Sequence, residues 1–64
     1  MPIRYIKEDG FHFYIVTEKG VKYARPKNRA RLINTTERTW SIECDGWVYV
    51  YDENAHLIQT RRYI

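Results

Sequence analysis

Along most of this chain, apolar and polar positions alternate in short runs. Turn residues separate one run from the next. Asp9-Gly10, Lys19-Gly20 and Asp45-Gly46 each lie between two such runs. Asp-Gly is favoured in two-residue hairpin turns, because both central residues of a type I′ turn need a positive φ. Residues 52–55, Asp-Glu-Asn-Ala, form a fourth turn as a four-residue connection. The spacing of the turns predicts a series of consecutive β-hairpins.

The runs between these turns have the composition of β-strands. Residues 11–17 are almost entirely aromatic or β-branched. Residues 40–44 alternate cleanly, with Trp40, Ile42 and Cys44 on one face. Residues 47–51 are apolar on both faces, as expected for a central strand. We therefore predict strands at residues 3–7, 11–17, 21–25, 40–44 and 47–51, with a sixth near 58–63.

Residues 26–39 interrupt this pattern. Pro26 has no N–H donor, so it ends the third strand or confines that strand to the edge of a sheet. Asn34, with Glu37 three positions later, is typical of a helix start and predicts a short helical turn at residues 35–39. The intervening connection would be long, and long loops often carry function.

Together these patterns predict one all-β domain over residues 1–64. The expected fold is a small antiparallel meander of five or six strands that forms a curled sheet or an SH3-like open barrel. At most one short helical turn, near residues 35–39, would accompany the strands.

The candidate catalytic and metal-binding residues are few and scattered. Ser41 is the only serine and has no glycine elbow around it, and Cys44 falls on the apolar face of its strand. His12, Cys44 and His56 lack the paired short spacings of a zinc site. We therefore expect no enzyme, no cofactor and no metal.

The lone cysteine, Cys44, fits a reducing compartment. No apolar run approaches the roughly 20 residues that a membrane helix needs, and the charged, aromatic N-terminus is unlike a signal peptide. We expect a cytoplasmic protein with no membrane partner.

The excess of basic over acidic residues is concentrated in one segment of the chain. The chain has 11 Lys and Arg residues against 8 Asp and Glu, a net charge of +3. Four of the 11 lie at alternate positions within residues 25–31, which leaves seven basic against eight acidic residues elsewhere. An extended backbone would point all four to one side over about 20 Å. Those four residues are Arg25, Lys27, Arg29 and Arg31.

This spacing predicts a small nucleic-acid-binding β module that contacts the phosphates of DNA or RNA with little sequence preference. Tyr23 continues the alternation and could stack on a base, and Arg61 and Arg62 would extend the basic patch. The same charges also fit a solvated loop that protects an edge strand from aggregation. Both interpretations remain open.

The ten aromatic residues suggest an alternative. Tyr, Trp and Arg concentrate at protein interfaces, so the chain could be a compact protein-binding module, such as a viral or mobile-element inhibitor of a host protein. Tyr23 and Tyr63 are the aromatic residues expected to be exposed. Because residues 11–17 are apolar on both faces, either a tightly curled sheet or a second subunit must cover one face. Of these two, a homodimer is favoured.

Residues 49–60, Tyr-Val-Tyr-Asp-Glu-Asn-Ala-His-Leu-Ile-Gln-Thr, resemble a single tyrosine-aspartate repeat of the large bacterial toxin shells. Those repeats usually carry glycine where this chain has Ala55, and they occur in long arrays. The resemblance implies a β-hairpin over these residues. A structural role in a virion or toxin shell is therefore a third functional hypothesis.

Overall fold

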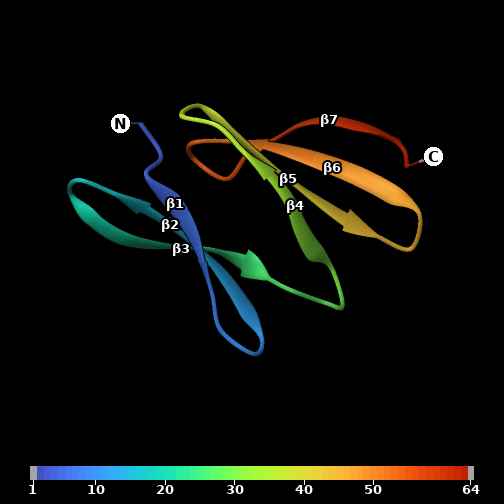
Figure 1. Cartoon of the computed structure of the whole chain (residues 1–64), viewed down its shortest axis with the longest axis horizontal. Helices are drawn as coiled ribbons and strands as arrows, with labels where there is room; N and C mark the ends of the chain where they lie inside the picture. Colours follow the sequence, from blue (N-terminus) through green and yellow to red (C-terminus); the bar gives the residue numbers. More distant parts are fainter. Residues whose placement is uncertain (1, 64) are drawn as a thin grey trace.

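Seven antiparallel strands in two sheets make up the computed structural model, which describes residues 2–63 (Figure 1). The first sheet has the order β1-β2-β3, and the second has the order β4-β5-β6-β7. Neighbouring strands are also consecutive in the sequence, so each sheet is a meander, as predicted. The strands are β1 (Tyr5–Glu8), β2 (His12–Thr17), β3 (Gly20–Pro26), β4 (Arg31–Thr35), β5 (Thr39–Cys44), β6 (Trp47–Asp52) and β7 (Leu57–Arg62).

The described part of the chain has seven strands where the sequence predicted five or six, and it has no helix. The additional strand is β4, in the region expected to be a long connection, and the helical turn predicted at residues 35–39 was wrong. Thr36 makes the local bonds there: its Oγ1 accepts the N–H groups of Arg38 at 3.2 Å and Thr39 at 3.0 Å. Residues 36–39 thus form a tight turn between β4 and β5. No helix within residues 2–63 could cross a membrane.

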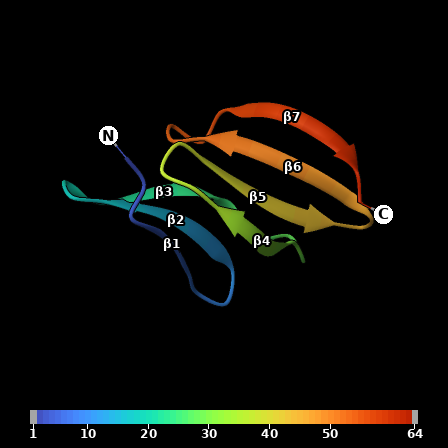
Figure 2. The same ribbon diagram turned by 45° about the horizontal axis from the view of Figure 1, so that its top comes forward.

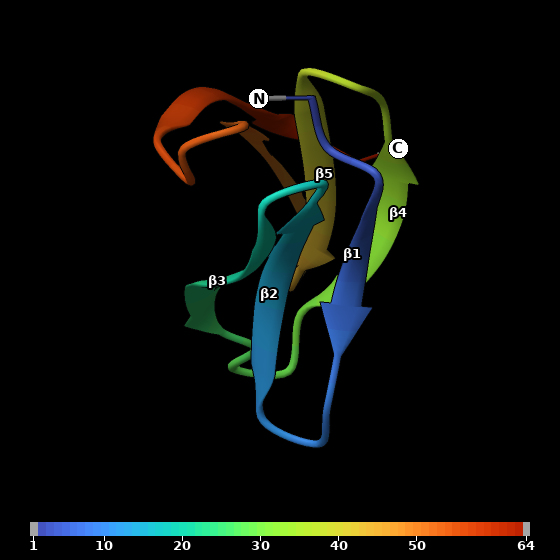
Figure 3. The ribbon, with the colours of Figure 1, turned by 90° about the vertical axis from the view of Figure 1, so that its left-hand side faces the viewer.

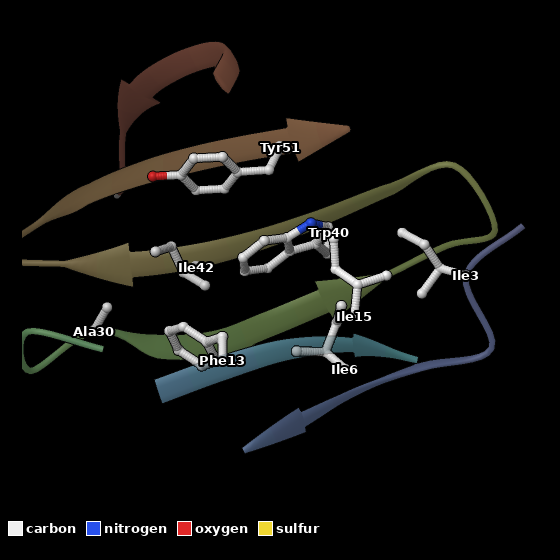
Figure 4. Packing of buried hydrophobic residues seen from close by; sticks show 8 residues of the cluster. All are labelled: Ile3, Ile6, Phe13, Ile15, Ala30, Trp40, Ile42 and Tyr51. Carbon is white, nitrogen blue, oxygen red and sulfur yellow. The ribbon is translucent and has the colours of Figure 1, made fainter. Parts of the chain in front are cut away.

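The core lies between the two sheets and takes side chains from both (Figure 4). Trp40 is its largest fully buried side chain. The Trp40 ring stacks on Tyr51 at a centroid distance of 4.8 Å and lies 5.7 Å from Phe13 of the first sheet. Its indole N–H donates to the carbonyl oxygen of Asp52 at 3.1 Å. Trp40 and Ile42 share this buried face with half-buried Cys44, as the alternation predicted.

The edges of the sheets are irregular or short. One unpaired residue interrupts the pairing of each of three edge strands, namely Ala24 in β3, Ile33 in β4 and Ile58 in β7. The fourth edge strand among the described residues, β1, has four residues. Bulges and short edge strands discourage pairing with other chains. Pro26 is the last residue of β3, and β3 lies at the edge of its sheet, so the prediction made for this proline is confirmed.

The hairpin implied by the toxin-shell resemblance is present as β6 and β7, two neighbouring curved strands (Figure 2). Ala55, at the position where the repeats carry glycine, has a φ of 65°. This left-handed conformation explains the glycine preference of the repeats. The shared feature is therefore the geometry of the turn.

Candidate functional site

The basic segment at residues 25–31 is not extended. β3 ends at Pro26 and β4 begins at Arg31, and a tight turn lies between them. In this turn the N–H of Ala30 donates to the carbonyl oxygen of Lys27 at 2.8 Å, and Asn28 and Arg29 have φ values of 46° and 67°. The chain changes direction here, so the prediction that the four cations point to one side was wrong.

Arg25 and Lys27 are half-buried, and both contact the core. The guanidinium of Arg25 lies 5.3 Å from the centroid of the Tyr51 ring and donates a hydrogen bond to the Tyr51 hydroxyl. The ammonium of Lys27 lies 3.1 Å from a carboxylate oxygen of Glu8 and 5.6 Å from the centroid of the Phe13 ring. The Arg25 contact joins the first sheet to the second, whereas the Lys27 contacts hold the β3–β4 turn against the first sheet.

Tyr23 and Arg25 lie on opposite faces of the first sheet. Tyr23 pairs with Tyr14, whereas Arg25 pairs with Phe13, so the bulge residue Ala24 lies between the two registers. A bulge of one residue reverses the alternation of side chains. The predicted continuation from Arg25 to Tyr23 was therefore wrong, although Tyr23 is exposed, as expected.

Arg31, Arg61 and Arg62 belong to the second sheet, away from Tyr23. Arg31 donates to Glu43 at 2.7 Å, and this hydrogen bond raises the pKa of Arg31 and lowers the pKa of Glu43. Arg61 pairs with Val48 across the sheet. The guanidinium of Arg62 lies 5.3 Å from the centroid of the Trp47 ring. The structure thus does not bring the seven predicted binding residues together.

The outer face of the first sheet carries a row of aromatic rings that the sequence analysis did not assemble. Figure 3 shows the first sheet from this outer side, with β1 and β2 in front and strands of the second sheet behind them. Tyr14 and Tyr23 are cross-strand partners with ring centroids 5.9 Å apart, and the ring of His12 lies 5.6 Å from that of Tyr23. Phe11, which is 77% exposed, extends the row at 6.4 Å from His12. We call Phe11, His12, Tyr14 and Tyr23 the aromatic strip.

Asp9 holds one end of the aromatic strip in place. Its Oδ1 accepts the backbone N–H groups of Phe11 at 2.8 Å and His12 at 2.7 Å, and its Oδ2 accepts the hydroxyl of Tyr14 at 3.1 Å. The hydrogen bond from Phe11 lowers the pKa of Asp9, and the bond to Asp9 raises the pKa of Tyr14. The strip is thus organised before any ligand binds, which lowers the entropic cost of binding.

Cations lie on both sides of the aromatic strip. The ammonium of Lys7 is 5.9 Å from the centroid of the Tyr14 ring. On the other side, an open hollow of about 460 Å³ separates the β1–β2 turn from the β3–β4 turn. We call this space the hollow; its lining residues are Gly10, Phe11, His12, Pro26, Lys27, Asn28 and Arg29. Two of the predicted basic residues, Lys27 and Arg29, therefore lie next to the strip.

Among residues 2–63, no group of three or more His, Cys, Asp or Glu side chains is placed to hold a metal ion. Comparison with protein-family models, curated proteins and solved structures finds no match to this chain. The functional argument therefore depends on the geometry of the aromatic strip and the cations beside it.

Proposed function

We propose that the protein binds single-stranded nucleic acid on the outer face of its first sheet. The observation that carries this proposal is the aromatic strip, in which Phe11 and Tyr23 are exposed and cations lie on both sides. Unpaired bases stack on such rings, and every base offers a flat face, so the interaction tolerates any sequence. A duplex keeps its bases inside its own stack and cannot use the strip in this way.

The phosphates of the bound strand would meet Lys7 and Arg29. This pair replaces the straight row of cations that the sequence suggested. Arg25 is engaged with Tyr51, Lys27 with Glu8 and Arg31 with Glu43. Phosphate contacts position a strand without reading its sequence. We therefore expect binding to depend on salt and only weakly on base composition.

Fluorescence anisotropy with labelled dT10 and a ten-base-pair duplex tests the proposal. Two phosphate contacts on a single strand predict that log K falls with log salt at a slope of about −1.4. We expect dT10 to bind at least about tenfold more tightly than the duplex, because stacking contributes roughly 1–3 kcal/mol per base. No binding of dT10 at low salt, or equal binding of the duplex, would contradict the proposal.

A pair of tyrosine variants tests the location. Tyr23→Ala removes a ring of the strip and should lower the affinity for dT10 by about 5- to 100-fold. Tyr63→Ala is the matched control, because Tyr63 is similarly exposed, 48% against 52%, but follows the last strand of the second sheet. It should leave the affinity unchanged. Equal losses in both variants would show that the strip is not the site.

One observation favours a second candidate, a protein-binding module. Tyr5, Val16 and Val21 are cross-strand partners that form an apolar row on the same outer face. Tyr5 and Val21, which are exposed at the two ends of this row, suit a protein partner, including a second copy of this chain. A stoichiometric protein that stays bound in nuclease-treated lysate, or a doubled mass in light scattering, would favour this candidate.

A further inference from the structure

The turn at residues 27–30 holds an arginine where a glycine is usual. Asn28 and Arg29 both have positive φ, and this turn has the geometry of a type I′ turn. The β5–β6 turn also has two consecutive positive φ values, 52° and 84°, but its residues are Asp45 and Gly46. A residue with a side chain is strained in the left-handed region, whereas glycine is not. Position 29 is therefore less stable with arginine than it would be with glycine.

The fold does not use the Arg29 side chain. It is exposed, and it makes no hydrogen bond, ion pair or ring contact with the described residues. By contrast, Arg25 lies over the ring of Tyr51, and Arg31 lies over the ring of Tyr63. Strained residues without a structural role concentrate at functional sites. The strain at Arg29 therefore suggests that its guanidinium serves a ligand.

The hollow places Arg29 opposite an aromatic face. Phe11 lines the hollow from the β1–β2 turn, and Lys27 and Arg29 line it from the β3–β4 turn. A backbone hydrogen bond of 2.8 Å, from the N–H of Lys27 to the carbonyl oxygen of Phe11, joins the two turns. The volume of about 460 Å³ is within the range of small-ligand sites.

We propose that the hollow is a single-nucleotide subsite at the end of the aromatic strip, with the base stacked on Phe11 and a phosphate bound by Arg29. A guanidinium can donate two parallel hydrogen bonds to a phosphate. Lys27, already paired with Glu8, adds a second positive charge nearby. This subsite rests on the proposed function and specifies where one of its phosphates binds.

Arg29→Gly tests the subsite without endangering the fold. Because glycine relieves the strain, we expect the melting temperature to rise by about 4 °C. The affinity for dT10 should fall about fivefold, and the salt slope should become less steep by about 0.7, the value for one lost phosphate contact. Ala55→Gly is the matched control: Ala55 has a φ of 65° in the β6–β7 turn, outside the lining of the hollow, so glycine relieves similar strain and keeps the cation, and affinity and slope should not change.

Phe11→Ala separates the stacking contact from the phosphate contact. It should lower the affinity for dT10 by about fivefold or more and leave the salt slope unchanged. Parental affinity and slope in Arg29→Gly would overturn the subsite while leaving binding by the rest of the strip intact. An equal loss of affinity in Ala55→Gly would also overturn it, since the loss would then not come from the guanidinium of Arg29. Absence of dT10 binding by the unaltered protein would overturn the subsite and the proposed function together.

Discussion

The outer faces of the two sheets differ in how they are covered. On the second sheet, Val48 is only 1% exposed although no further strand lies over it. Its cross-strand neighbours are Glu43 and Arg61, and the pair of Arg31 and Glu43 continues the row. On the first sheet, Val16 is 9% exposed, but its neighbour Val21 is 59% exposed, and Phe11 and Tyr23 of the strip are exposed as well. The second sheet covers its own outer face with long side chains, whereas the first leaves apolar and aromatic surface for a partner.

Glu43 is central to this difference. One of its carboxylate oxygens accepts from Arg31 at 2.7 Å, and the other accepts the backbone N–H of Gly46 at 3.1 Å. Arg31 is thus already paired, and its guanidinium also lies over the ring of Tyr63, so it is less available to a phosphate. A basic residue in this protein therefore indicates a binding site only when the fold leaves its side chain unpaired.

The largest expected effect comes from breaking the core that supports both faces. Trp40→Ala removes a fully buried ring that contacts both sheets, and this should cost about 3–5 kcal/mol. A domain this small has a total stability near the lower end of the usual 5–15 kcal/mol, so the variant should be largely unfolded by circular dichroism. Trp47→Ala is the control, because the Trp47 ring is 40% exposed, and it should cost about 1 kcal/mol or less. A folded Trp40→Ala variant would contradict the single shared core.

A smaller effect should separate the two outer faces directly. Val48→Ala leaves a cavity under the side chains of the second sheet and should cost about 2 kcal/mol in urea unfolding. Val21→Ala makes the same chemical change on the open face of the first sheet and should cost less than about 0.5 kcal/mol. Similar losses for the two variants would mean that the two faces are equally covered.

Acid should produce a more gradual effect. Backbone N–H groups lower the pKa of Asp9 and of Asp52, chiefly those of Phe11 and His56 respectively, and Arg31 lowers the pKa of Glu43. The stabilisation from these carboxylates is complete above their ordinary values, 3.8 for Asp and 4.5 for Glu. It is lost as pH falls through the lower values of the folded state.

Urea unfolding between pH 7 and pH 2.5 measures this loss. Asp9→Asn should weaken the pH dependence only in part, because Asp52 and Glu43 keep their contributions. Stability that stays constant or rises below pH 4 would contradict the assigned hydrogen bonds.

The strands of this protein could be predicted from the sequence because their signals are local. Strand-forming runs and the turns between them, Asp45-Gly46 and residues 52–55, define the β5–β6 and β6–β7 hairpins without reference to the rest of the chain. β4 could not be predicted, because Asn34 and Glu37 imitate a helix start. Its strand conformation depends on pairing with β5, and that pairing is a tertiary contact.

The location of the candidate site depends on how the strands pair, and the sequence alone does not specify this strand register. Alternation from Tyr23 to Arg31 is valid only in a regular strand, and the bulge at Ala24 and the left-handed pair Asn28 and Arg29 both interrupt it. The alternation of His12 and Tyr14 in the sequence already placed these two rings on one face of β2. Its continuation to Tyr23 required the cross-strand pairing that only the structure gives.

Amide chemical-shift mapping by NMR tests the central claim most directly, because it reports on both outer faces in one titration with dT10. The proposed interface predicts the largest shifts at residues 11–14, at Tyr23 and at the turn of Asn28 and Arg29, with β5, β6 and β7 almost unchanged. Shifts concentrated around Arg31, Glu43 and Arg61 on the second sheet, or no shifts at all, would contradict it.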